Sequence, residues 1–179
     1  HNIRNATAAI SLAFTIGLPE KCIKAGLHNF KGVQRRFSHL FDHNKISFYD
    51  DYAHHPTEIS SVLSGVEKVY KNKEIVCVFQ PHRISRLISL KREFSKCFKK
   101  ADTVLLCPIY TANEKLKLNF TYHSFAKLII KNSNVRLIQV EDELQLQKFI
   151  KQNVFGEKIY IGMGAGSISN WMKNLKNIF

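Results

Sequence analysis

The feature that most constrains this chain is the alternation of short, wholly apolar runs with segments whose apolar residues recur at helical spacing. Ile75–Phe79 is such a run, and Thr103–Cys107 is apolar after its threonine; a segment with helical periodicity follows the first after a short loop and the second after a loop to about Phe120. A strand that is apolar throughout is buried on both faces, which happens when helices cover both sides of a parallel sheet. The sequence therefore predicts an α/β fold, a Rossmann-like, doubly wound and mostly parallel sheet with helices on both faces.

Two helices and two strands are expected before the first long helix of this pattern. The apolar stripe over Ile3–Ile16 predicts a helix capped by Asn2, and Pro19 opens a second helix that ends near residue 29. We therefore expect residues 1–31 to be helical and separate from a Rossmann-like domain over residues 32–179. Short alternating strands are predicted at residues 37–41 and 46–49. Later strands are expected at residues 75–79, 103–107, 135–140 and 158–161, with helices beginning near residues 56, 84, 122, 143 and 168; the helix from Ile84 is expected to continue to Phe98.

The charge of the chain suggests an anionic partner without identifying it. There are 27 basic and 14 acidic residues, giving a formal net charge of +13. Most of the basic residues are lysines scattered along the chain, whereas specific anion recognition favours the planar fork of arginine. The aromatic residues fall mostly at core-spaced positions and do not alternate with basic ones. We therefore expect no nucleic-acid partner.

The apolar segments and the cysteines indicate the cellular compartment in which the protein is expected. No apolar run approaches about 18 residues, so no membrane-spanning helix and no membrane partner are expected. The segment Ala6–Leu18 is interrupted by polar residues and lacks a small-residue cleavage site, which argues against a signal peptide. The four cysteines form no C-x-x-C pair, and three lie in apolar segments. Buried, reduced thiols and a cytoplasmic location are the expectation.

The loop that follows the second strand, Asp50–Glu58, concentrates acids, a tyrosine and two imidazoles ahead of a helix. Because the carboxyl ends of parallel strands share one edge of a sheet, chemistry is expected in such loops. Three readings stay open for this one. It is a solvated turn capped by His55, a metal site made by Asp and His, or a site for a negatively charged ligand. In the last reading His54 is a charged donor and the carboxylates bind hydroxyls or a magnesium-bound water.

Two further loops carry candidate anion-binding features. Arg83 and Arg86 follow the strand 75–79 and share one face of the first turn of the next helix, where guanidinium groups bind carboxylate or phosphate. The alternative is a surface ion pair with Glu93 or Asp102. The glycines of Gly162–Gly166 permit either a close approach to phosphate or an ordinary tight turn. By themselves these residues indicate an anionic ligand and nothing more specific.

Six motifs, in order along nearly the whole chain, resemble the Mur ligase family, and the Q-P-H-R block resembles its alanine-adding branch. The motifs are H-N-x-x-N-A at His1–Ala6, G-V-x-R-R-F at Gly32–Phe37, D-D-Y-A-H-H-P-T-E at Asp50–Glu58, F-Q-P-H-R-x-S-R at Phe79–Arg86, I-Y-x-A-x-E at Ile109–Glu114 and G-M-G-A-G-S-I at Gly162–Ile168. The resemblance implies an ATP- and Mg²⁺-dependent ligase that joins L-alanine to UDP-N-acetylmuramate through an acyl phosphate, in peptidoglycan precursor synthesis.

The resemblance also implies roles for individual residues. The adenine- and ribose-side contacts would be His1, Asn2 and Asn5. The nucleotide contacts of the C-terminal domain would be Arg36 and one of Asp50 and Asp51. The residues that reach the muramate carboxylate, the amino acid or the transferred phosphate would be Tyr52, His54, Arg83 and Arg86, with His54, Arg83 and Arg86 catalytic.

The family's phosphate loop, of the form G-x-x-x-x-G-K-[ST], is absent from this sequence. In the family that loop and most magnesium ligands precede the residues matched here. We therefore expect residues 1–31 to be the end of the central ATP-binding domain, the chain to be a fragment, and the fragment alone to be inactive. Two alternatives remain open: the related murein-peptide recycling ligase, and a non-catalytic nucleotide-binding relic. The sequence gives no oligomeric state.

Overall fold

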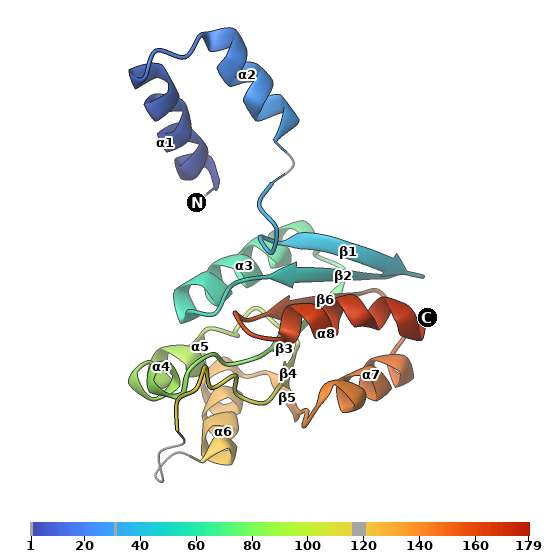
Figure 1. The fold of residues 1–179 in the computed structure, drawn as a ribbon. Helices are drawn as coiled ribbons and strands as arrows, with labels where there is room; N and C mark the ends of the chain where they lie inside the picture. The colour runs from blue at the N-terminus through green and yellow to red at the C-terminus, as the bar shows by residue number, and fades with distance from the viewer. Residues whose placement is uncertain (1, 31, 116–120) are drawn as a thin grey trace. The chain divides into compact units, whose positions relative to one another are not determined.

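The computed structural model describes residues 2–30, 32–115 and 121–179, which fall into two compact units, His1–Val33 and Gln34–Phe179. The first unit contains α1 (Asn2–Thr15) and α2 (Glu20–Asn29), coloured blue in Figure 1. The turn between them uses Gly17 at a φ of +80°, a conformation that glycine adopts without strain. Pro19 precedes α2 in an extended conformation. Both helices expected from the sequence are therefore present.

The second unit is built on a six-stranded sheet whose strand order is β1-β2-β6-β3-β4-β5. The strands are β1 (Ser38–His43), β2 (Ile46–Asp51), β3 (Glu74–Phe79), β4 (Thr103–Leu106), β5 (Arg136–Gln139) and β6 (Lys158–Met163). Only the β1–β2 pair is antiparallel, and all other neighbours run parallel. The last strand of the chain thus inserts between β2 and β3. The expected doubly wound, mostly parallel sheet is confirmed.

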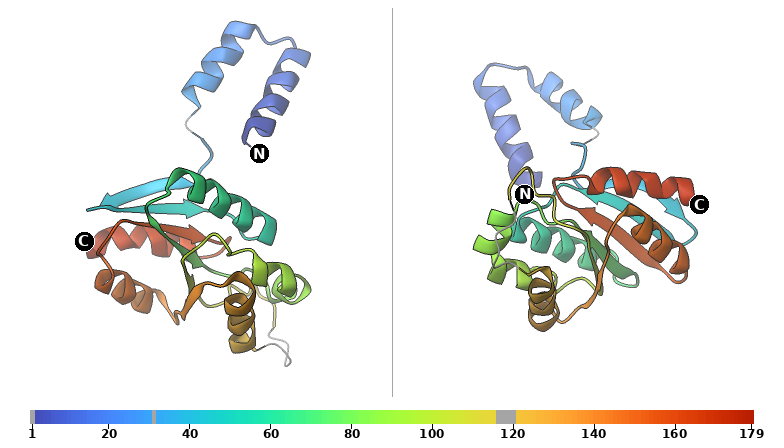
Figure 2. Two further views of the ribbon diagram at one scale, coloured as in Figure 1. Left: turned by 180° about the vertical axis from the view of Figure 1, so that it is seen from behind. Right: turned by 60° about the horizontal axis from the view of Figure 1, so that its bottom comes forward.

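Alternate residues of the central strands enter two separate cores, one on each face of the sheet. Along β3, Cys77 and Phe79 face one core while Val76 and Val78 face the other. The helices on the first face are α3 (Pro56–Val69), α4 (Ile84–Ser89), α5 (Lys91–Lys96) and α6 (Tyr122–Ser133). The helices on the second face are α7 (Glu143–Gln152) and α8 (Ile168–Asn174), followed by a 3₁₀ turn at Leu175–Ile178. Figure 2 shows these two layers from further directions. Burial on both faces explains why the strands are apolar throughout.

The single helix expected from Ile84 to Phe98 is wrong. The structure has two six-residue helices, α4 and α5, separated at Leu90, whose ψ of 25° departs from the helical value. The direction of α5 is set by α6, because Ser133 Oγ donates to the carbonyl of Ser95 (2.7 Å) and Asn132 Nδ2 donates to Ser95 Oγ (2.8 Å). These contacts between distant segments carry no local signal, and apolar periodicity continues through the break.

Several boundaries differ from the sequence prediction in a way that affects the site. Asp50 and Asp51 belong to β2 and not to the following loop, and Met163 belongs to β6. Among the cysteines, all reduced, Cys77, Cys97 and Cys107 are buried as expected, whereas Cys22 is exposed. Within the described ranges, no helix is both long and apolar enough to cross a membrane.

Candidate functional site

The loops at the carboxyl edge of the sheet are joined to one another by backbone hydrogen bonds. The N–H of Gln80 donates to the carbonyl of Met163 (2.9 Å), and that of Gly164 donates to Asp51 (3.3 Å). On the other side, the N–H of Arg83 donates to the carbonyl of Tyr110 (2.9 Å), and the N–H of Tyr110 donates to Pro81 (2.8 Å). The segments after β2, β3, β4 and β6 therefore form one connected surface.

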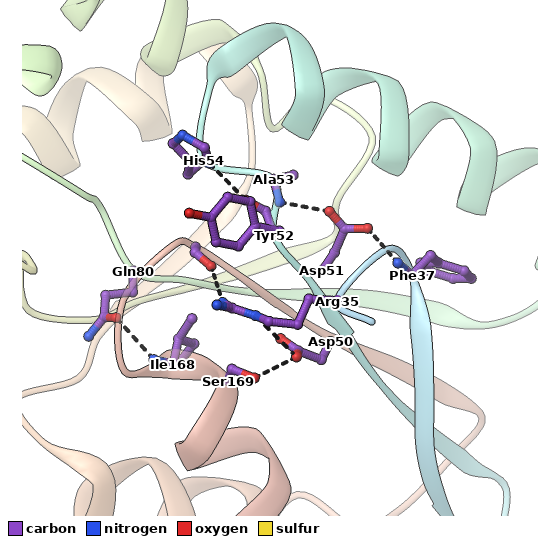
Figure 3. A network of polar contacts seen from close by, with 11 residues as sticks. Arg35, Phe37, Asp50, Asp51, Tyr52, Ala53, His54, Gln80, Ile168 and Ser169 are labelled. Carbon is purple, nitrogen blue, oxygen red and sulfur yellow. Dashed lines mark hydrogen bonds and ion pairs between the residues drawn. The ribbon is translucent and has the colours of Figure 1, made fainter. Parts of the chain in front are cut away.

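The deeper part of this edge is a set of polar side chains that we call the inner network: Arg35, Asp50, Asp51, Gln80 and Ser169 (Figure 3). Arg35 Nη2 donates to the carbonyl of Gly164 (2.5 Å), and Arg35 Nε lies 3.5 Å from Asp50 Oδ2. The same Asp50 oxygen accepts from Ser169 Oγ at 2.6 Å. The Arg35 guanidinium also lies 4.7 Å from the centre of the Tyr52 ring. Arg35 thus links three loops of the edge.

Asp51 uses both carboxylate oxygens within the protein. Oδ2 accepts from the N–H of Phe37 (2.6 Å) and Oδ1 accepts from the N–H of Ala53 (2.7 Å), while the residue is only 3% exposed. Burial raises the pKa of Asp51 and outweighs the opposing effect of these two hydrogen bonds. Asp50 is also buried, and its Oδ1 has no hydrogen-bond partner among the described residues. Both aspartates therefore point into the domain.

The two neighbouring arginines of the 35–36 pair have different positions, which the sequence did not distinguish. Arg35 is part of the inner network, with a φ of +60°, whereas Arg36 is exposed. The positive charge of Arg36 still acts on Asp51 and Glu58, where it favours the ionised carboxylates. Arg36 is therefore the member of the pair that a ligand can reach.

The glycines after β6 are explained by contacts within the protein. A Cβ at Gly164 would lie 2.7 Å from the carbonyl oxygen of Gln80, and one at Gly166 would lie 2.6 Å from the Tyr110 ring. The side chain of Gln80 closes the same junction, because its Oε1 accepts from the N–H of Ile168 (3.0 Å) and its Nε2 donates to Ser167 Oγ (3.0 Å). Of the two readings of the glycine run, close loop packing is the one that the geometry supports.

The more exposed part of the edge is a group that we call the outer cluster: His54, His82, Arg83, Arg86 and Glu114. The rings of His54 and His82 lie 5.9 Å apart, and His82 stacks on Tyr110 at 5.4 Å. Burial lowers the pKa of His82, and the positive charges of Arg86, His54 and Arg83 lower it further. The charges of Arg86, His54 and Arg83 thus all act on one side chain at this edge, and the His54 ring lies near it.

The two arginines of the outer cluster differ in their contacts. Arg83 has a φ of +68°, which is strained for a non-glycine residue, and its Nη1 lies 3.9 Å from Glu114 Oε1. The surface ion pairs considered with Glu93 and Asp102 are not formed; Asp102 instead accepts from the N–H of Ile75 (2.7 Å). Arg86 Nη1 is buried without a hydrogen-bond partner in the described part of the chain. A guanidinium nitrogen without a partner keeps an unused donor, and an anion is the kind of group that pairs with it.

The helix after the first loop begins with a structural cap. His55 Nδ1 accepts from the N–H of Thr57 (3.3 Å), and Glu58 Oε2 accepts from the N–H groups of His54 (3.1 Å) and His55 (3.2 Å). This reciprocal capping box assigns His55 to the fold. The ring of His54 lies 5.9 Å from that of His82, and its Nδ1 lies 2.8 Å from the carbonyl of Tyr52 and 3.6 Å from Glu58 Oε2. The two adjacent histidines therefore differ: His55 caps α3, whereas His54 lies beside His82.

The remaining candidates lie at the edge of what the structure describes. Tyr52 is 38% exposed beside Arg35 and His54. His1 and the side chain of Asn2 fall outside the described residues, and Asn5 is exposed on α1 in the first unit. No group of three or more candidate metal ligands occurs among the described side chains. Glu114 is the site residue whose role the sequence did not anticipate; its only signal was its place in the I-Y-x-A-x-E motif.

Comparison with known proteins gives a consistent result. Residues 35–166 match the family model described as "Mur ligase, glutamate ligase domain". The chain is 64% identical over 178 residues to a UDP-N-acetylmuramate–L-alanine ligase of Pelagibacter ubique, covering 99% of this chain and 38% of that protein. It is 37% identical to the corresponding ligase of Caulobacter vibrioides, covering 96% of this chain and 36% of that protein. The chain thus spans little more than a third of these relatives.

Solved structures give the same picture for the fold. A UDP-N-acetylmuramate–alanine ligase from Thermotoga maritima superposes with a TM-score of 0.74 at 29% identity, covering 99% of this chain and 37% of that one. A murein peptide ligase from Psychrobacter arcticus superposes with a TM-score of 0.73 at 22% identity, covering 99% of this chain and 36% of that one. At that identity the second likeness concerns the fold alone.

Proposed function

Because this chain belongs to the Mur ligase family, we propose that the protein to which it belongs is an ATP-dependent ligase that joins L-alanine to UDP-N-acetylmuramate in peptidoglycan precursor synthesis. The observation that carries the proposal is the outer cluster, where His54, Arg83 and Arg86 gather around His82 and one buried guanidinium nitrogen has no partner. The 64% identity to an alanine-adding ligase supports this substrate over the murein peptides of the recycling enzyme.

The proposed reaction explains why positive charge gathers at this place. Activating the muramoyl carboxylate as an acyl phosphate, and then attacking it with an amine, brings several anionic groups together. Arg83 and Arg86 would bind carboxylate or phosphate oxygens, and His54 would donate a further hydrogen bond. Tyr52 lies beside His54 with its ring against Arg35, and we propose that its exposed edge contacts the same ligands.

Nucleotide binding is proposed for residues around the inner network. Arg36 is exposed close to Asp51, and we propose that it contacts the phosphates or ribose of ATP, while Asp51 holds the backbone of the neighbouring Phe37. His1, Asn2 and Asn5 are proposed for the adenine side. Magnesium would neutralise phosphate charge during transfer. The described residues offer it no cluster of three ligands, so no residue of this chain is assigned to it.

The test measures phosphate release by the full-length protein that contains this chain, with ATP, UDP-N-acetylmuramate and L-alanine. We expect turnover that requires all three, and no turnover by residues 1–179 alone. Arg83→Ala is expected to lower kcat/KM by more than tenfold, which corresponds to about 1.4 kcal/mol of transition-state stabilisation. Arg92→Ala, which removes an exposed arginine of α5, is the matched control and should leave kcat/KM unchanged. Turnover with a murein peptide but not with alanine would support the recycling ligase instead.

A further inference from the structure

We infer that Arg83 and Glu114 together form the receptor for the two charged groups of the amino-acid substrate. Arg83 would bind its α-carboxylate, and Glu114 would bind its α-ammonium group. This inference rests on the proposed function and adds to it one residue, Glu114, with the role of binding the ammonium group of the amino acid. An amino acid at neutral pH carries both charges within a few ångströms, so its receptor needs one cation and one anion at similar spacing.

The distance between the two side chains suits such a ligand. Arg83 Nη1 and Glu114 Oε1 are 3.9 Å apart, which is too far for a direct hydrogen bond but close enough for one small zwitterion to contact both. The Arg83 side chain is 53% exposed and that of Glu114 is 25% exposed, so a ligand can approach each of them. The pair thus presents opposite charges side by side on an accessible surface.

The backbone holds the two residues in this relation. The N–H of Arg83 donates to the carbonyl of Tyr110 (2.9 Å), and the N–H of Tyr110 donates to Pro81 (2.8 Å). His82 and Tyr110 also pair as an isolated parallel bridge, with their rings stacked. The short ladder between the two loops therefore fixes the spacing of the charges before a ligand arrives, which lowers the cost of binding.

Glu114 is suited to hold a cation. Its Oε2 accepts from the N–H of Ser85 (2.9 Å) and its Oε1 accepts from Ser85 Oγ (2.7 Å). A carboxylate offers about four acceptor positions, so the two hydrogen bonds from Ser85 do not use all of them. The hydrogen bonds from Ser85, backbone first and hydroxyl second, lower the pKa of Glu114, and it therefore stays ionised at neutral pH.

The rest of the outer cluster explains why an acid is needed here. His54, Arg83 and Arg86 attract carboxylate and phosphate but repel an ammonium group. Glu58, the other acid close to the cluster, uses its Oε2 to accept from the N–H groups of His54 and His55 in the cap of α3. Glu114 is therefore the carboxylate best placed to receive the amine end of the substrate.

The experiment compares L-alanine with L-lactate in the full-length protein. Lactate keeps the carboxylate and replaces the ammonium group by a hydroxyl, so it competes with alanine using only the Arg83 half of the receptor. In Glu114→Gln we expect the KM for alanine to rise by about tenfold or more, as for loss of a charged hydrogen bond. The inhibition constant of lactate, and the KM values for ATP and UDP-N-acetylmuramate, should change by less than about twofold. Arg83→Ala should weaken alanine and lactate together.

Two further variants separate recognition of the ammonium group from a purely structural role. Ser85→Ala removes one hydrogen bond to Glu114 but keeps its charge, so the KM for alanine should stay within about threefold of the wild type. Glu114→Asp keeps the charge on a shorter side chain and should recover part of the alanine affinity lost in Glu114→Gln. If Ser85→Ala reproduces the effect of Glu114→Gln, or if lactate and alanine weaken equally in Glu114→Gln, the inference is overturned. Absence of alanine-dependent turnover in the wild type would instead contradict the proposed function.

Discussion

The inner network and the outer cluster lie on the same edge of one sheet, yet their polar side chains differ in how far they are exposed. In the inner network, Asp51 has both oxygens bonded to backbone N–H groups, and Asp50 and Gln80 are almost fully buried. In the outer cluster, Arg83 is half exposed and a nitrogen of Arg86 has no partner among the described residues. The hydrogen bonds of Asp51 and Gln80 hold the loops together, whereas the half-exposed Arg83 side chain is open to a ligand.

The comparison predicts that substitutions in the inner network mainly lower stability, whereas substitutions in the outer cluster mainly lower activity. Asp51→Ala should produce the largest loss of stability, because it leaves the buried N–H groups of Phe37 and Ala53 without acceptors. We expect the free energy of unfolding to fall by about 2 to 4 kcal/mol. Urea unfolding followed by the fluorescence of Trp171, which lies in α8, measures it.

The matched variant in the outer cluster is Arg83→Ala. Its side chain is 53% exposed and makes one long ion pair, so the free energy of unfolding should change by no more than about 0.5 kcal/mol. The division fails if Arg83→Ala destabilises the protein as much as Asp51→Ala does. The outer cluster would then be part of the structural framework as well.

A smaller loss of stability is expected when Gly164, which packs closely against Gln80 of the inner network, is replaced. Gly164 has a φ of +152°, and a Cβ there would meet the carbonyl oxygen of Gln80 at 2.7 Å. Gly164→Ala should therefore destabilise the protein by about 1 to 3 kcal/mol. Gly65 lies on the exposed side of α3 with open space around it, so Gly65→Ala should stabilise by about 0.5 to 1 kcal/mol. Thermal or urea unfolding checks both, and a neutral Gly164→Ala would return the glycine run to the phosphate-binding interpretation.

Much of this fold could be predicted because the hydrophobic pattern follows directly from burial. Strands such as 75–79 are apolar throughout because the sheet is covered on both sides, and this pattern is visible without a structure. The break at Leu90 and the insertion of β6 between β2 and β3 could not be predicted. Both depend on contacts between residues far apart in the chain, and the break at Leu90 is not marked by a proline or glycine.

The sequence predicted which residue types make up the candidate site. The structure shows which of these side chains turn into the domain and which stay exposed. Arg35 and Arg36 are equivalent in the sequence, as are His54 and His55, yet one member of each pair is built into the fold. Which member turns inward depends on loop conformations such as the positive φ of Arg35. The sequence placed Asp50 and Asp51 in a loop because acidic residues are rare in buried strands, and the saturation of Asp51 by two N–H groups is what allows it there.

The smallest expected effect sharpens the comparison through pH. Burial gives Asp51 a pKa in the folded protein above its ordinary value of 3.8, whereas the hydrogen bonds from Ser85 give Glu114 a pKa below its ordinary value of 4.5. As the pH rises from 3.8 through the folded pKa of Asp51, the unfolded chain loses its proton first, so wild-type stability should fall relative to Asp51→Asn. As the pH falls from 4.5 through the folded pKa of Glu114, the unfolded chain gains its proton first, so wild-type stability should fall relative to Glu114→Gln.

Urea unfolding of the three proteins between pH 3 and about 6.5 tests this, because titration of the shared acids cancels in each difference. The two differences should therefore have opposite slopes against pH, and slopes of the same sign would show that the two carboxylates do not differ in the way their surroundings indicate.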